Sequence, residues 1–285
     1  MQHYLDSYKQ MVSLRGLTGH TLKSYATYIH AYLDYLENML GKQPEDVTWQ
    51  ELRDFVLFIQ TRRSLADRTV NACISQLRFF TLYVLHKPWD PYQLPSRKFD
   101  SYLPFVPTQQ ETQAFISSIP DLKPKTMVSL MYSAGLRIGE VCHLKCSDID
   151  RKSMRIHVAR GKNRSDRYAL LSPKVLSLLE DYWRSCGRPG SYLFPQKSSP
   201  DKPVRPAYLS RHIHAHEDRL GWKRRLTCHS FRHAFGTHLY ENGTDLLTIK
   251  SLLGHKSFNS TAIYVQLANG GIGKAVSPFD TLEGF

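Results

Sequence analysis

Histidines and an arginine gather in the segment CHSFRHAFGTH, residues 228–238, and could bind either a metal ion or an anion. His229 and His233 are four residues apart, as two zinc ligands on one helix face would be, while His229 and Arg232 are three apart, as two phosphate ligands would be. A zinc protease would need a glutamate directly after the first histidine, where Ser230 stands. Because the planar guanidinium of Arg232 matches two phosphate oxygens, the sequence favours an anion site and predicts that the His229–His233 pair is incidental.

A second candidate zinc cluster is the segment CHLKC, residues 142–146. Its two cysteines, Cys142 and Cys146, fall in a helical pattern, where small buried thiols are common core residues. The chain has five cysteines, and this odd, scattered set argues against a disulfide framework. We therefore expect reduced thiols, no metal ion and no cofactor.

Further segments carry groups that suit phosphate chemistry. A phosphodiester transition state concentrates negative charge on its oxygens, and fixed cations stabilise it. A tyrosine hydroxyl, with a pKa of about 10, needs a base or nearby cations to become a nucleophile at neutral pH. The segments are Gly135-Leu136-Arg137, Lys162 in a predicted hairpin turn, Leu253-Gly254-His255, and Tyr264 nine residues beyond that histidine.

In this order, and with the His-x-x-Arg of residues 229–232, these motifs resemble the tyrosine recombinase family, which includes the Xer-type resolvases and phage integrases. The resemblance covers nearly the whole chain, because TLKSYATYIHAYLDYL, residues 21–36, is similar to the core-binding domain of the family. It implies a mainly α-helical fold with a small antiparallel β-sheet. A helical core-binding domain would precede a mixed α/β catalytic domain.

The resemblance also implies roles for individual residues. Tyr264 would attack a DNA backbone phosphate, giving a 3′-phosphotyrosyl bond and a 5′-hydroxyl. Arg137 and Arg232 would clamp the non-bridging oxygens, and Lys162 would protonate the departing 5′-oxygen. The bond to tyrosine would conserve the energy of the cleaved phosphodiester, so rejoining would need no ATP.

Two histidines complete the implied catalytic set. His229 would assist proton transfer at the tyrosine, and His255 would donate a further hydrogen bond. We expect Glu140, His233 and His238 to be supporting or packing residues of the same pattern. The full implied set is Arg137, Lys162, His229, Arg232, His255 and Tyr264.

Two positions leave alternatives open. The predicted hairpin turn reads RGKNRSDR, residues 160–167, whereas the family usually has a second glycine directly after the lysine. Arg160 or Arg164 could therefore take the role given to Lys162. Tyr240 is a rival to Tyr264 as nucleophile, but it follows the His-x-x-Arg helix in an apolar context where packing is expected.

The elements that position these groups begin with a helical bundle. Apolar residues repeat every three to four positions over residues 18–40, and Gly41 then ends the pattern. Thr48 and Glu51 form a capping box before another helix. With helices near residues 4–14 and 66–85, four helices are expected. Aromatic residues such as Tyr25 could contact DNA, although most are expected in the core.

Five prolines in residues 86–108 predict a linker, which divides the chain into a core-binding domain at 1–100, a linker at 101–106 and a catalytic domain at 107–285. A second capping box, at residues 108–111, opens two or three helices that run to about residue 143. A β-hairpin is expected over 154–172, helices from 173, and a loop over 187–206. The hairpin carries five positive charges at or near its turn: Arg155, Arg160, Lys162, Arg164 and Arg167.

The net charge of the chain indicates what kind of partner it binds. The chain has a formal net charge of +13, with 12 Lys and Arg against 10 Asp and Glu in residues 1–100 but 26 against 15 in residues 101–285. Basic residues dispersed through a folded region suggest a polyanion, most often nucleic acid. No run of 18 apolar residues and no signal peptide occurs, so we expect a cytoplasmic protein that does not bind membranes.

The sequence thus predicts a site-specific DNA recombinase that binds double-stranded DNA with a specific target site. The resemblance implies a homo-tetramer acting on two DNA sites, and the apolar tail at residues 276–282 is short enough to dock on a neighbouring protomer. Because the chain starts almost directly with the bundle, no additional arm-binding domain is expected. The hairpin and the linker differ from the usual Xer-type sequences. This difference favours the integrase or transposase of a mobile element over a Xer-like resolvase. The alternatives are a type IB topoisomerase and a non-catalytic DNA-binding protein on the same scaffold.

Overall fold

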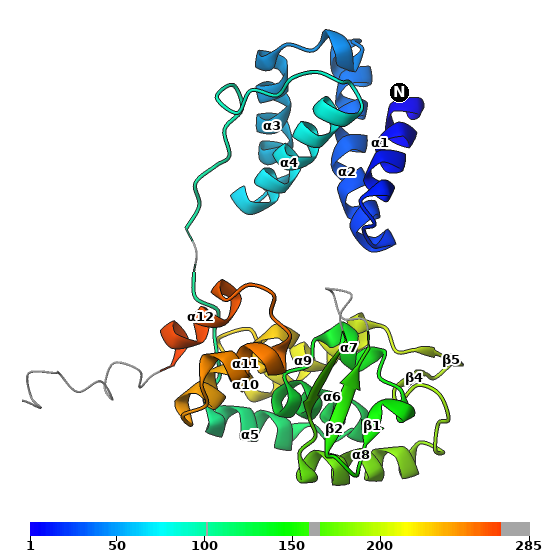
Figure 1. The fold of residues 1–285 in the computed structure, drawn as a ribbon, viewed down its shortest axis with the longest axis vertical. Coiled ribbons are helices and arrows are strands. Elements are labelled where there is room, and N and C mark those ends of the chain that lie inside the picture. The colour runs from blue at the N-terminus through cyan, green and yellow to red at the C-terminus, as the bar shows by residue number, and fades with distance from the viewer. Residues whose placement is uncertain (101, 160–165, 269–285) are drawn as a thin grey trace, which may run out of the picture. The chain divides into compact units, whose positions relative to one another are not determined.

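The computed structural model describes residues 1–100, 102–159 and 166–268. The chain forms two compact units, Met1–Tyr102 and Leu103–Phe285 (Figure 1). Both are mainly helical, and the second adds short antiparallel strands, so the predicted fold class is confirmed. No helix in the described part of the chain is long and apolar enough to span a membrane.

The first unit contains the four expected helices. Gly41 ends the second of them in the left-handed conformation, with φ at 61°, after a π-helical turn at Leu36–Leu40. The Thr48–Glu51 capping box is present. A core of aliphatic and aromatic side chains includes Tyr32, while Tyr25 packs partly buried against it. The helices are α1 (Gln2–Leu14), α2 (Gly19–Tyr35), α3 (Trp49–Arg63) and α4 (Asp67–Tyr83).

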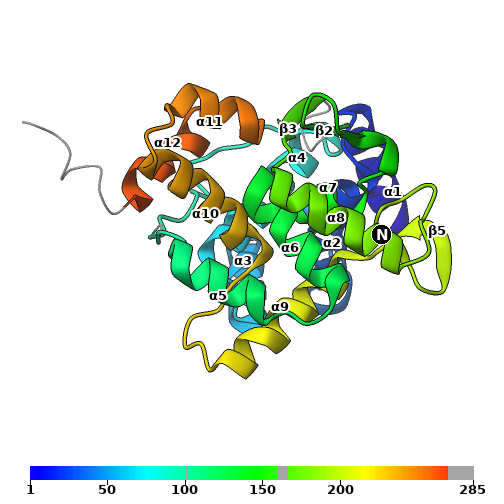
Figure 2. The same ribbon diagram turned by 90° about the horizontal axis from the view of Figure 1, so that it is seen from below.

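The second unit is built around α6, which packs against α5, α8, α9 and α10. The capping box that starts α5 at Thr108 is present as predicted. The helices are α5 (Gln109–Ser118), α6 (Leu122–Ala134), α7 (Ile138–Cys142), α8 (Pro173–Ser185), α9 (Pro206–Leu220), α10 (Cys228–Glu241), α11 (Leu246–Leu253) and α12 (Asn259–Leu267). Figures 1 and 2 show α10, α11 and α12 side by side.

A three-stranded antiparallel sheet, in the order β1-β2-β3, carries the predicted hairpin. Ile156 pairs with Ala169, and both face the core. The strands are β1 (Ile149–Asp150), β2 (Arg155–Val158) and β3 (Arg167–Leu170). The hairpin turn with Lys162 lies outside the described residues.

The expected loop at 187–206 contains a second, two-stranded sheet of β4 (Pro195–Gln196) and β5 (Ser199–Pro203). The loop prediction was wrong at these residues. Strands this short, with a proline at one end of each, carry no alternating apolar pattern that sequence reasoning could detect.

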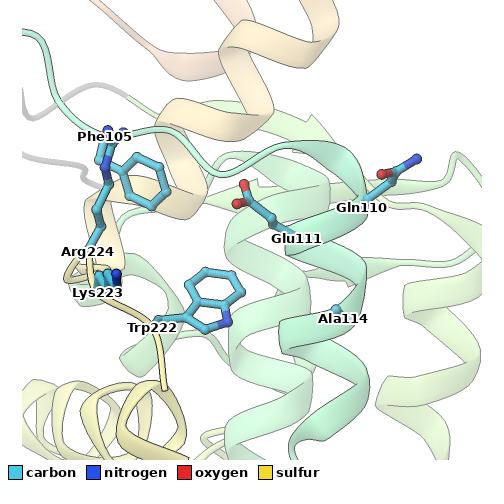
Figure 3. A pocket seen from close by; sticks show the side chains of 7 residues that line it. All are labelled: Phe105, Gln110, Glu111, Ala114, Trp222, Lys223 and Arg224. Carbon is cyan, nitrogen blue, oxygen red and sulfur yellow. The ribbon is translucent and has the colours of Figure 1, made fainter. Parts of the chain in front are cut away.

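The loop between α9 and α10 is held by aromatic packing against α5 and the start of the unit. Trp222 packs against Phe115 with ring centroids 5.6 Å apart, and the guanidinium of Arg224 lies 5.2 Å from the ring centroid of Phe105. Phe105, Trp222 and Arg224, together with Glu111, line a pocket of about 580 Å³ (Figure 3). The packing fixes where α10 begins, and α10 carries the His-x-x-Arg motif.

Candidate active site

Arg232 is almost completely buried beneath the surface of the second unit, at 3% exposed. Its Nη1 donates to the carbonyl oxygen of Gly135, and its Nη2 donates to that of Leu253 over 2.6 Å. Gly135 has φ at 61°, and a Cβ there would lie 2.5 Å from the Phe235 ring, so only glycine fits the position. Burial, followed by the charge of Arg137, lowers the pKa of Arg232 to about 10. Arg232 therefore remains charged at neutral pH.

Arg137 and Glu140 form a local ion pair at the start of α7. The Glu140 carboxylate accepts from the backbone N–H of Arg137 over 2.8 Å and from its Nη1 over 2.9 Å. The Glu140 side chain is only 8% exposed, and its Oε2 also lies 4.0 Å from Arg232. Burial raises the pKa of Glu140, but the hydrogen bonds and charges of Arg167 and Arg137 outweigh it and lower the pKa to about 2.

Arg167, the first residue of β3, connects three parts of the chain. Its guanidinium binds both Glu140 oxygens, at 2.8 and 2.7 Å, and its Nε donates to the carbonyl oxygen of Leu252 over 3.1 Å. Its side chain also packs on Gly254, where a Cβ would lie 2.7 Å from the Arg167 Cδ. We call Arg137, Glu140, Arg167 and Arg232 the arginine clamp.

Sequence reasoning missed the place of Arg167, which it grouped with the charges near the hairpin turn. Glu140 was predicted as a supporting or packing residue, and it lies within 4.0 Å of all three clamp arginines, which it supports. The sequence signal that could have pointed to Arg167 was its position at the start of a predicted strand, directly after the turn. That position does not reveal a partner 27 residues earlier in the chain.

Tyr264 lies on α12 with its ring against α10, and it is 1% exposed. A Cβ on Gly236 would lie 2.5 Å from the Cζ of Tyr264, so the glycine allows this close approach. The ring stacks with His255 at a centroid distance of 6.3 Å and lies 6.1 Å from the ring of His233. Burial raises the pKa of Tyr264 to about 12, although the charges of Arg232 and Arg137 act in the opposite direction. We call His233, Gly236, His255 and Tyr264 the tyrosine cage.

The two cage histidines are neutral at pH 7. Burial, then the charge of Arg232, lowers the pKa of His255 to about 4, and its Nδ1 lies 3.0 Å from the Thr261 hydroxyl. Burial, then the neighbouring His229, lowers the pKa of His233 to about 4. Neutral imidazoles beside a phenol can accept its proton, which a charged imidazolium cannot do.

His229 is exposed at the first turn of α10, with its ring 5.7 Å from that of His233. Side chains four residues apart on a helix are neighbours, and here the second one extends the contact to Tyr264. The structure thus brings together Arg137, Arg232, His255 and Tyr264, with His229 at the edge, while Lys162 lies outside the described residues.

The other candidates from the sequence were a metal site, the cysteines and Tyr240. No group of three or more His, Cys, Asp or Glu side chains among the described residues lies close enough to hold a metal ion. Cys142 is buried, and burial raises the pKa of its thiol to about 12. Tyr240 packs partly buried against the apolar cluster of α10, α11 and α12, as expected.

Comparison with known proteins finds matches for both units of the chain. Residues 107–270 match the phage integrase family, and residues 4–91 match the phage integrase N-terminal SAM-like domain. A protein of Sinorhizobium fredii named as an integrase/recombinase is 35% identical over 273 residues, covering 95% of this chain and 86% of its own length. The tyrosine recombinase XerA of Thermococcus onnurineus is 28% identical, covering 98% and 96%.

Solved structures share the fold. A lambda integrase dimer bound to a core site has a TM-score of 0.74 at 19% identity, covering 97% of this chain and 98% of that chain. XerH bound to its palindromic difH substrate has a TM-score of 0.71 at 19% identity, covering 91% and 80%.

The chain belongs to the phage integrase family. Within that family it is a tyrosine recombinase, an enzyme that binds DNA, breaks its strands and rejoins them.

Proposed function

We propose that the second unit cuts DNA through Tyr264, which attacks a backbone phosphate and becomes covalently attached to the 3′ end. In the reverse step a 5′-hydroxyl attacks the phosphotyrosyl bond and rejoins the strand. The observation that supports this role is the cage: Tyr264, carried on α12, lies beside two neutral histidines and under the electrostatic influence of Arg232 and Arg137.

The arginine clamp would hold the phosphate. A guanidinium has five N–H donors. Arg137 uses Nη1 on Glu140 and is 20% exposed, and Arg232 uses one donor on each Nη for a carbonyl, so both retain donors for phosphate oxygens. His255 would donate to the same phosphate, and Lys162 would protonate the departing 5′-oxygen.

Tyr264 must be uncovered for this reaction, because it is buried against Gly236. We infer that α12 shifts when DNA binds and presents the hydroxyl to the phosphate. The segment of nine residues is short, and its contacts are with α10 and α11.

The two units would have different roles. We propose residues 1–100 as the core-binding domain, 101–106 as the linker and 107–285 as the catalytic domain. Four protomers would act on two specific DNA sites, with the tail at 276–282, outside the described residues, docking on a neighbour. The departures of the hairpin and linker from the usual Xer-type sequences favour a mobile element as the source. The five cysteines, all free thiols, support action in the cytoplasm.

A trapping experiment tests the chemistry and finds the target site at the same time. The full chain is incubated in EDTA with a library of nicked duplexes of random sequence, and the DNA bound covalently to protein is recovered and sequenced. We expect a defined sequence to be enriched with the wild type and no adduct with Tyr264→Phe. Absence of the wild-type adduct, or its persistence in Tyr264→Phe, would contradict the proposal.

A further inference from the structure

His233 is a half-buried ionisable group that the proposed function places beside Tyr264 but gives no step of its own. It lies on α10 one turn after His229 and one turn before Gly236. Its Nδ1 is buried and has no hydrogen-bond partner within the part of the chain that the structure describes. A buried polar atom without a partner destabilises a fold, so its retention calls for an explanation.

His233 lies between Tyr264 and the exposed His229. Its ring lies 6.1 Å from that of Tyr264 on one side and 5.7 Å from that of the exposed His229 on the other. The hydroxyl-bearing end of Tyr264 lies over Gly236, on the same face of α10, because Cζ is the ring atom nearest to a Cβ built there. His233 therefore stands between the phenol and the helix N-terminus.

The other histidine beside the phenol is already engaged. The Nδ1 of His255 is within 3.0 Å of the Thr261 hydroxyl, and Thr261 is fully buried. His233 can accept a proton at Nδ1 without first breaking a hydrogen bond to another described residue.

We propose that His233 takes the proton of Tyr264 when a DNA phosphate is bound and passes it to His229. The inference rests on the proposed function. The O–H bond of Tyr264 breaks, its proton moves to the imidazole, and the phenolate oxygen bonds to phosphorus as the bond to the 5′-oxygen breaks and that oxygen takes a proton from Lys162. In rejoining, the 5′-hydroxyl gives its proton back to Lys162 and its oxygen bonds to phosphorus. The bond from phosphorus to the Tyr264 oxygen breaks, and that oxygen takes back the proton from His229 through His233.

Charges around His233 make this transfer depend on DNA. The ionisable groups that face it are His229 and Arg232 on α10, Tyr264 on α12 and His255 after α11. Burial, followed by the charges of His229 and Arg232, lowers the pKa of His233 to about 4, while burial raises the pKa of Tyr264 to about 12. The proton therefore stays on the tyrosine. A phosphate bound by Arg232 would offset its charge and raise the pKa of His233.

The test measures the rate of covalent adduct formation with the nicked duplex recovered above, over pH 5 to 9. We expect His233→Asn to bind this duplex like the wild type, to form the adduct about 100-fold more slowly at pH 7, and to lose the rise of rate with pH. His233→Ala should be rescued by added imidazole. His238→Asn is the matched control, because His238 lies on the same helix and binds the Tyr132 hydroxyl over 3.0 Å. It should keep the wild-type pH profile.

Two results would overturn the inference while leaving the proposed function intact. One is a wild-type rate, within about threefold, and a wild-type pH profile in His233→Asn. The other is a slow His233→Ala variant that keeps the wild-type pH profile and does not respond to imidazole. If the wild type forms no adduct at all, the proposed function fails, and this inference fails with it.

Discussion

The arginine clamp and the tyrosine cage lie next to each other but are stabilised in opposite ways. In the clamp, the charged side chains of Arg137, Arg167 and Arg232 bind a carboxylate or carbonyl oxygens, and burial is offset by these bonds. In the cage, the pKa values of about 4 and about 12 keep every group neutral at pH 7. The clamp thus holds positive charge in place, while the cage keeps the nucleophile protonated.

The largest effect is expected from removing the buried arginine of the clamp. Arg232→Met leaves the carbonyl oxygens of Gly135 and Leu253 without their donor and removes a phosphate ligand. We expect a loss of about 100- to 1,000-fold in adduct formation, measured as a single-turnover rate. Arg225→Met is the matched control, because the Arg225 side chain is 63% exposed. An equal loss in both variants would contradict the special role of the buried position.

Neutralising Glu140 tests whether the clamp is held by its carboxylate. Glu140→Gln leaves three neighbouring cations without their shared counterion, and breaking a buried ion pair costs about 3 to 5 kcal/mol. Urea unfolding should show a lower free energy of unfolding of that order. The exposed carboxylate Asp218, paired with Arg225, provides the control, and Asp218→Asn should cost at most about 1 kcal/mol. A Glu140→Gln chain as stable as the wild type would show that the clamp does not depend on this charge.

Gly236→Ala is a test of the cage alone. The added methyl group would lie 2.5 to 2.8 Å from atoms of the Tyr264 ring, so α12 must move away from α10. Overpacking of this kind costs about 1 to 3 kcal/mol. Hydrogen exchange should become faster in α12 and remain unchanged in β2 and β3. Unchanged protection in α12 would mean that the tyrosine is not held by this contact.

The smallest expected effect is a difference in the pH range over which the clamp and the cage lose stability. Histidines whose pKa is lowered to about 4 from 6.5 bind fewer protons in the folded state, so the cage loses stability as pH falls from about 6.5 to about 4. The pKa of Glu140, lowered to about 2 from 4.5, makes the clamp lose stability only as pH falls from about 4.5 to about 2.

Two variants show which region causes each loss of stability. The free energy of unfolding is measured for each variant as the pH is lowered. His233→Asn should reduce the upper step by on the order of 2 kcal/mol, and Glu140→Gln should remove the lower one. If both variants changed the same step, the two regions would not be electrostatically distinct.

Local sequence signals predicted local structure well. The capping boxes at Thr48 and Thr108 were predicted because their bonds close within three residues. The candidate site was predicted through motifs whose order resembles a known family. Arg167 was missed because its acceptor Leu252 lies 85 residues away, and no pattern near β3 indicates that contact. Likewise, no local pattern shows that His233 lies beside Tyr264, which is on another helix.

The most direct measurement is the position of the covalent bond. Protein trapped on the nicked duplex is digested with trypsin, which places Tyr264 in the peptide of residues 257–274 and Tyr240 in that of residues 233–250. Mass spectrometry should find the nucleotide adduct on the first peptide, at Tyr264. An adduct on the second peptide, or none on either, would contradict the account.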